Sequence, residues 1–137
     1  MSLHLLPLPS LSMRKTSILA LRTGLAITFI VVGVYIWLHP TIWYSMLLPW
    51  AKGITVGGTA RPILQAVAIF DIFIGILFLL DLWTWIVALI ASVMLVLSLA
   101  ATGVSDATVR DIGLLGASLA LLFATMPEKT ARKMRVR

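Results

Sequence analysis

The chain has 137 residues, of which 61% are hydrophobic and only 12% are charged, and its mean hydropathy is +1.07. This composition excludes an ordinary soluble domain and indicates one compact unit embedded in a membrane. The chain has no cysteine, which excludes disulfide relays, thiolate nucleophiles, iron–sulfur clusters and cysteine-ligated zinc. The net charge of +6 comes from residues between and outside the apolar runs, so it indicates topology signals and anionic-lipid contacts rather than nucleic-acid binding.

The first apolar run covers residues 17–38 and follows an N-terminal tail, residues 1–16. The run is too long for a signal peptide and lacks a small-residue cleavage site, so we predict a first transmembrane helix. It carries Arg22 near its start and the aromatic residue Trp37 near its end. Gly24 belongs to a series of small residues at every fourth position, which favours close packing against another helix.

An aromatic segment follows the first helix, which His39 and Pro40 end because a residue before proline is pushed out of helical geometry. We expect a short interfacial helix over residues 41–48 and then a loop through Gly57 and Gly58. The aromatic residues of the outer segment are Trp43, Tyr44 and Trp50. We interpret these residues as anchors in the headgroup region, although the tryptophans could instead wall an amphipathic pocket under the outer loop.

The second apolar run, residues 62–80, contains a single carboxylate, Asp71, at its centre. A helix of this length spans roughly 28 Å, about the thickness of a bilayer core, so Asp71 would lie near the membrane midplane. An aspartate there costs about 2.5–3.5 kcal/mol on insertion scales. We expect no other acid inside a span to share its proton. Asp71 is therefore predicted to face the bundle interior and to be mainly neutral near pH 7.

Asp71 has two interpretations. It could be a proton or cation site, or a group that hydrogen-bonds a quinone-like headgroup, with Arg22 as the second member of a polar centre. Alternatively, Asp71 could be a neutral structural acid bonded to a backbone carbonyl or to a serine, and Arg22 could extend to the cytoplasmic surface. The candidate serines are Ser92, Ser98 and Ser118.

The third and fourth apolar runs predict two more spans, over residues 83–101 and 107–125. The tight turn before the third span predicts that the second and third helices are antiparallel neighbours. Trp83 and Trp85 are interpreted as interfacial anchors at the start of the third helix.

The fourth helix carries a charged pair and a stripe of small residues. Arg110 and Asp111 are expected to pair at the outer interface, where Asp111 would favour the positive end of the helix dipole. Gly116 and Ala120 are expected to pack against another helix. A basic tail, residues 127–137, follows the four-helix domain, which covers residues 17–126.

Orientation follows from the basic residues, because cytoplasmic ends of spans carry an excess of Lys and Arg. Eight of the 11 lie on the side of the two termini, so we expect both termini in the cytoplasm. The eight are Arg14, Lys15, Arg22, Lys129, Arg132, Lys133, Arg135 and Arg137.

Three stretches resemble the DoxX family of small four-helix membrane proteins. LRTGLAITFIVVGVYIWLHP resembles the first helix of the family, AVAIFDIFIGILFLL the second and RDIGLLGASLALLF the fourth. Asp71 stands where glutamate is common in the family, and Ile36 stands where many members carry a lysine. Members are linked to quinone-connected sulfur oxidation and to membrane redox complexes.

The sequence thus predicts an all-α bundle of four transmembrane helices in the cytoplasmic membrane. The resemblance implies a small subunit of a respiratory or redox assembly without a complete active site of its own. A quinone or a lipid could bind, but no metal site and no cysteine- or histidine-held cofactor is expected. The alternatives are a small proton-coupled transporter or channel-like oligomer that uses Asp71, and a structural assembly factor. The expected partners are the lipid bilayer and either further copies of the chain or the other subunits of a membrane complex.

Overall fold

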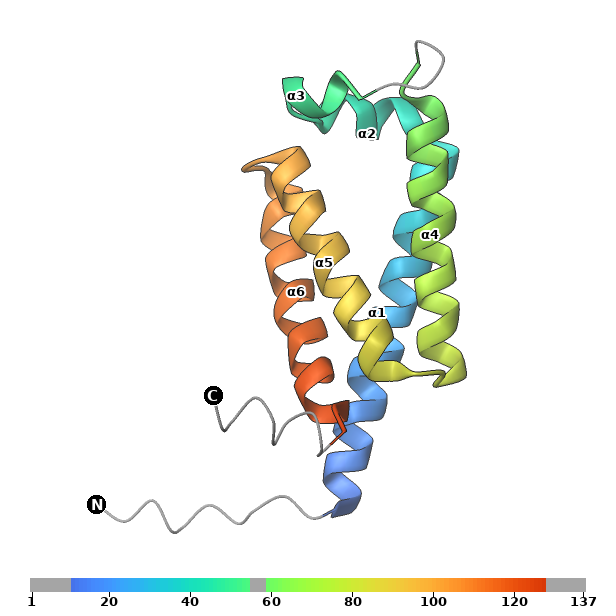
Figure 1. Cartoon of the computed structure of the whole chain (residues 1–137), viewed down its shortest axis with the longest axis vertical. Coiled ribbons are helices and arrows are strands. Elements are labelled where there is room, and N and C mark those ends of the chain that lie inside the picture. The colour runs from blue at the N-terminus through green and yellow to red at the C-terminus, as the bar shows by residue number, and fades with distance from the viewer. Residues whose placement is uncertain (1–10, 55–58, 128–137) are drawn as a thin grey trace, which may run out of the picture.

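The computed structural model describes residues 11–54 and 59–127, and all its long elements are α-helices (Figure 1). Four helices are long and apolar enough to cross a membrane, which confirms the predicted all-α four-span bundle. The loop through Gly57 and Gly58, most of the N-terminal tail and nearly all of the basic tail lie outside the described residues. The helices are α1 (Leu11–Leu38), α2 (Pro40–Met46), α3 (Pro49–Lys52), α4 (Arg61–Leu80), α5 (Thr84–Thr102) and α6 (Asp106–Thr125).

The observed bounds differ from the expected ones mainly at the first helix and the outer segment. Helix α1 begins at Leu11 rather than at residue 17, so its first turns lie outside the apolar run. Thr16 and Ser17 each donate a hydrogen bond to the carbonyl four residues earlier, at 3.0 and 2.9 Å. The outer segment forms two short helices instead of one, because Pro49 begins a new helix at its first position.

The long helices form two pairs, α1 with α4 and α5 with α6. The pairs approach each other at the α4–α5 turn, and α4 and α5 diverge from there towards the opposite end (Figure 1). The expectation that these two helices are antiparallel neighbours therefore holds only near the turn. The short helices α2 and α3 lie across the open end, opposite the α4–α5 turn (Figure 1).

Two glycines outside the predicted small-residue series let α1 and α4 approach closely. A Cβ atom on Gly33 would lie 2.7 Å from the carbonyl oxygen of Ala68, and one on Gly75 would lie 2.8 Å from that of Ala26. Both distances are shorter than real Cβ contacts, so each helix contributes one glycine to a reciprocal contact.

The packing predicted for Gly24, Gly116 and Ala120 is wrong for this chain. All three residues are exposed, and a Cβ on Gly24 or Gly116 would meet nothing within 4 Å. A four-residue spacing puts small residues on one helix face but does not say which face meets a neighbour. The close contact of α1 with a neighbouring helix lies at Gly33 instead, against α4.

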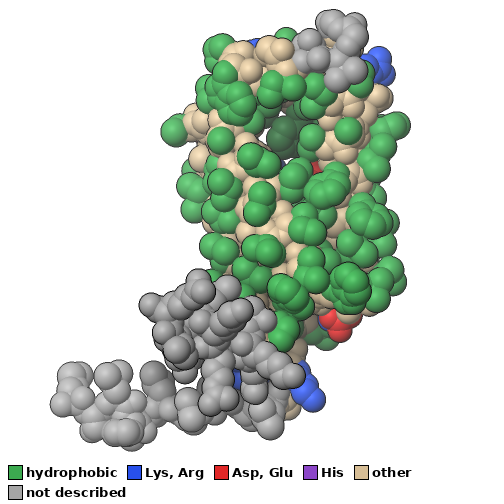
Figure 2. Space-filling view, in the orientation of Figure 1, with side chains coloured by type: hydrophobic (Ala, Val, Ile, Leu, Met, Phe, Trp, Pro, Cys, Tyr) green, Lys and Arg blue, Asp and Glu red, His purple; other side chains and the backbone are tan. Residues whose placement is uncertain are grey.

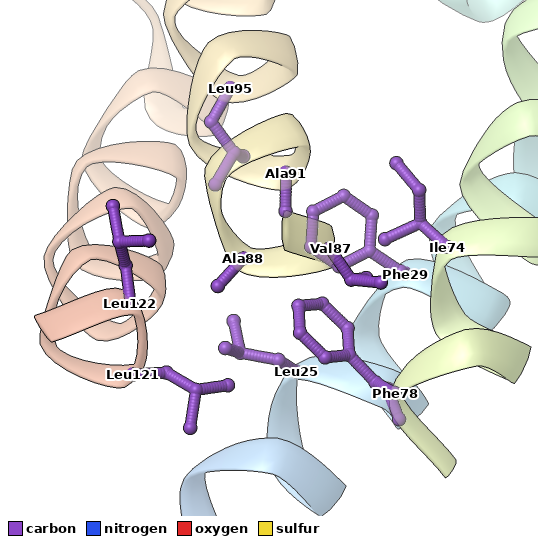
Figure 3. Packing of buried hydrophobic residues seen from close by; sticks show 11 residues of the cluster. Leu25, Phe29, Ile74, Phe78, Val87, Ala88, Ala91, Leu95, Leu121 and Leu122 are labelled. Carbon is purple, nitrogen blue, oxygen red and sulfur yellow. The ribbon is translucent and has the colours of Figure 1, made fainter. Parts of the chain in front are cut away.

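The hydrophobic core fills the end of the bundle at the α4–α5 turn, where the helix pairs meet (Figure 3). The rings of Phe29 and Phe78 join α1 to α4, with centroids 6.2 Å apart. Ser92 and Ser118 join α5 to α6 through a hydrogen bond of 2.8 Å between their hydroxyls. This end of the bundle is therefore packed, and any internal space lies towards α2 and α3.

The α4–α5 turn is held by a polar contact that includes Arg22. Asp81 ends α4 in the left-handed conformation, with φ at 56°. Its carboxylate forms an ion pair with Arg22 of α1 and accepts a hydrogen bond of 2.6 Å from the hydroxyl of Thr84 in α5. Arg22 thus lies with Asp81, at the end of α4, and not with Asp71.

Acidification should weaken this contact. The hydrogen bond from Thr84, with a further contribution from Arg22, holds the pKa of Asp81 below its usual value of 3.8. A carboxyl group with a lowered pKa in the folded state stabilises the fold above its unfolded pKa and loses this effect as the pH falls. Between about pH 5 and pH 3 we expect melting in detergent to fall further for the parent than for Asp81→Asn, by a small amount because Asp81 is largely exposed. Parallel pH profiles would contradict this assignment.

Candidate functional site: a cavity between the helix pairs

A cavity of about 370 Å³ lies where α4 and α5 diverge, below α2 and α3. Figure 2 shows the corresponding hollow between hydrophobic side chains, with an acidic side chain beside it. The hollow opens on the side of the bundle, so a molecule could enter from the lipid. Its walls are mainly apolar and include Phe29, Ile36, Leu64, Val67, Met94 and Leu114.

The outer end of the cavity is covered by the α2–α3 segment. The backbone N–H of Leu48 donates a hydrogen bond of 2.8 Å to the carbonyl of Ala101 in α5. Gly103, which ends α5 with φ at 65°, leaves room for the Leu48 side chain, whose Cδ2 would lie 3.2 Å from an added Cβ. The cover is thus attached to the α5–α6 pair by Leu48.

Asp71 lines this cavity from the middle of α4, and the residue is only 7% exposed. No residue in the described ranges donates a hydrogen bond to its carboxyl group. The three candidate serines have other partners, because Ser92 and Ser118 bond each other and Ser98 bonds Asp111. The structure therefore does not show a serine-bonded structural acid at this position.

Asp111 lines the same cavity from α6 and is 5% exposed. Its Oδ2 accepts a hydrogen bond of 3.1 Å from the hydroxyl of Ser98, and its Oδ1 lies 3.5 Å from Nε of Arg110. The expected contact with Arg110 is present, but the expected exposed interfacial position of Asp111 is wrong. Consecutive residues of a helix point about 100° apart, so Arg110 reaches outward while Asp111 turns inward.

Two carboxyl groups thus share one apolar cavity, and the expectation that Asp71 is the only acid within the spans is wrong. Asp71 comes from the α1–α4 pair and Asp111 from the α5–α6 pair. Both carboxyl groups offer hydrogen-bond acceptors to a molecule in the cavity.

Some tryptophans line the cavity, and others stay candidates for membrane anchors. Trp43 and Trp50 line the cavity, as the pocket alternative predicts, while Trp85 packs against the core. Trp37 and Trp83 are exposed, and their role as anchors stays a prediction, as does that of Tyr44, which lies under the ammonium group of Lys52. The indole N–H of Trp43 is buried and has no hydrogen-bond partner within the described part of the chain.

The sequence contains a signal for the inward position of Asp111, although its charged neighbour Arg110 favours the surface. Asp111 shares one helical face with Ser118 and Leu121, at spacings of seven and ten residues, and all three are buried. Taken as a whole, this face predicts that Asp111 points into the bundle. No comparable signal identifies Trp43, because its burial depends on the fold of the outer segment.

The fold and the cavity define a four-helix integral membrane protein with a polar site that opens towards lipid. The chain belongs to the DoxX family, whose model matches residues 17–104, from α1 to the α5–α6 turn. Asp71 lies within the matched region, whereas Asp111 and the rest of α6 lie beyond it. No curated protein and no solved structure gives a significant match.

Proposed function

We propose that this protein is a small integral membrane subunit of a redox assembly and holds a lipid-soluble, quinone-like molecule in its cavity. The observation that carries the proposal is the carboxyl group of Asp71, which has no hydrogen-bond partner among the described residues and lines a mainly apolar cavity that opens on the side of the bundle. Small-molecule sites typically combine apolar walls with a few polar groups that fix the orientation of the ligand. The volume of this cavity lies near the lower end of the range for such sites, which begins at about 300 Å³.

The chemistry of the chain fits a subunit better than a complete enzyme. It has no cysteine and only two histidines, and His39 lies at the start of α2, outside the cavity. The cavity can hold and orient a headgroup through Asp71, Asp111 and the indole N–H of Trp43. Electron transfer would then fall to a partner protein in the assembly.

The test is to purify the protein in mild detergent and to identify the lipids and proteins that remain bound by mass spectrometry. We expect an isoprenoid quinone or a chemically similar amphiphile, enriched over bulk lipid, together with a redox enzyme. Asp71→Leu should lose the amphiphile. Asp106→Leu is the matched control, because Asp106 is exposed and lies outside the cavity. Bulk phospholipid in equal proportions from all three proteins would contradict the proposal.

A proton-coupled transporter is the second candidate, and the pair Asp71 and Asp111 favours it. Two acids in one cavity that is closed at the inner end, where Arg22 contacts Asp81, could exchange protons for a substrate. Proton flux into vesicles that carry the pure protein would support this function, and its loss in Asp71→Asn would identify the group. An assembly factor is not favoured by the geometry, because none of the serines that the structure describes bonds Asp71.

We also propose that the protein lies in the cytoplasmic membrane with both termini inside, because eight of the 11 basic residues lie on that side. In this orientation the cavity opens in the outer half of the bilayer. A compartment-sensitive reporter fused after Arg137 should report the cytoplasm. Activity of a reporter that works only outside the cytoplasm would reverse the topology.

A further inference from the structure

We infer that the cavity selects a ligand whose polar end carries a free hydroxyl group and that this hydroxyl donates a hydrogen bond to Asp71. The inference rests on the proposed function and narrows its ligand from quinone-like amphiphiles in general to the neutral hydroxyl-bearing ones, such as phenols, which include the quinol form of a quinone. It depends on which hydrogen-bonding groups around the cavity already have partners.

Asp71 presents an unmet acceptor to the cavity. The residue is only 7% exposed, yet no described residue donates a hydrogen bond to it. A carboxyl group keeps acceptor capacity whether or not it is protonated. Leaving such a group unpaired in a buried site is costly, so a bound molecule that supplies a donor gains the corresponding free energy.

The hydroxyl donors of the cavity lining are already used by the protein. Thr28 donates to the carbonyl of Gly24, Thr102 donates to that of Ser98, and Ser98 donates to Asp111. Of the other donors in the lining, Arg110 lies beside Asp111, and the indole N–H of Trp43 does not bond Asp71. The donor for Asp71 therefore comes from the ligand or from water.

Trp43 supplies a free donor on the same wall. Its indole N–H has no partner in the described ranges. Trp43 packs against the small cluster of Ile36, Leu64 and Ala68, and Ala68 precedes Asp71 by one turn of α4. A hydroxyl-bearing ligand contains both an O–H donor and an oxygen acceptor, which match the two kinds of unpaired group that line this cavity. An ether or a ketone supplies only the acceptor, so it leaves the acceptor oxygen of Asp71 unpaired even where the carboxyl group is protonated and donates to it.

A cationic ligand fits these walls less well than a neutral one. Asp111 already has Ser98 and Arg110 beside it, and the remaining lining is mainly apolar. Moving an ammonium group from water into such surroundings costs far more than moving a hydroxyl. The neutral hydroxyl is therefore the polar group that the cavity accepts most readily.

The test uses two probes that differ only in the donor, a para-decyl phenol and its methyl ether. Binding to the purified full-length protein in nanodiscs can be followed by tryptophan fluorescence, because Trp43 and Trp50 line the cavity. We expect the phenol to bind about tenfold more tightly than the ether, as one hydrogen bond to a buried carboxyl group would give. The preference should disappear in Asp71→Leu and persist in Asp106→Leu.

Asp71→Asn serves as a second variant if the leucine variant does not fold. Its amide keeps an acceptor oxygen for the phenol but adds an N–H donor that can serve the ether, so the preference should shrink there rather than disappear. Equal binding of both probes to the parent, or a preference that is undiminished in the Asp71 variants, would overturn the inference but leave the proposed function intact. Tighter binding of a decyl trimethylammonium ion than of the phenol would also overturn it. If the protein binds neither neutral probe, the proposed function falls as well.

Discussion

Gly33→Leu and Gly75→Leu should prevent α1 and α4 from docking and should sharply reduce the yield of folded protein. Even a Cβ atom at either position would lie within 2.8 Å of a carbonyl oxygen of the facing helix. Backbone cannot move aside as a flexible side chain can, so the smaller changes Gly33→Ala and Gly75→Ala should each cost about 1–3 kcal/mol of stability. Thermal melting in detergent measures the effect.

Gly116→Ala is the matched control, because Gly116 is also a glycine in a long helix. An added Cβ there meets nothing within 4 Å, and alanine is the better helix former by about 0.5–1 kcal/mol. We therefore expect the control to melt at the same temperature or slightly higher. If Gly116→Ala lowered the melting temperature as much as Gly75→Ala, the contact between α1 and α4 would not be what limits stability. An interface on α6 with another copy or a partner would then explain the loss.

Filling the cavity should abolish ligand binding without unfolding the bundle. Ala101 lines the cavity near the outer end of α5, whereas its neighbour Ala100 is exposed and lies outside the cavity. In Ala101→Phe the new ring would occupy space that the ligand needs, and we expect at least a tenfold loss of the co-purified amphiphile relative to the parent. The measurement is the ratio of bound amphiphile to protein by mass spectrometry.

Ala100→Phe adds the same ring on the lipid side and should leave this ratio unchanged. Melting curves of both variants establish that the fold is intact. A normal amount of bound amphiphile in a folded Ala101→Phe protein would show that the molecule binds elsewhere on the surface.

The helices could be predicted from the sequence because an apolar run long enough to cross the bilayer must be helical there. In the hydrocarbon core only a helix satisfies the backbone hydrogen bonds of a single segment. Helices α4, α5 and α6 each begin and end within one residue of the expected spans. The outer aromatic segment was also recognisable, since His39 and Pro40 end one helix and begin another. These features depend on local chemistry alone, which a single sequence contains.

The site was harder to predict because it depends on which helix faces meet. The free-energy cost of a carboxylate in a membrane singles out Asp71, whereas the sequence predicts only an outer-interface pair with Arg110 for its companion Asp111. Likewise, Gly24 and Gly33 both lie in α1, and only the position of α4 distinguishes them. Such choices are made by tertiary packing between segments far apart in the sequence.

The cavity opens sideways between α4 and α5, so its occupancy depends on the composition of the surrounding bilayer. A molecule that reaches the cavity through the lipid exchanges with the bilayer, so its effective concentration is its mole fraction among the lipids and not its amount per volume of buffer. Adding empty vesicles at a fixed total amount of the phenol should therefore dilute it in two dimensions and empty the cavity, even though neither protein nor probe has been removed. Changing the buffer volume at a fixed ratio of probe to lipid should leave occupancy almost unchanged.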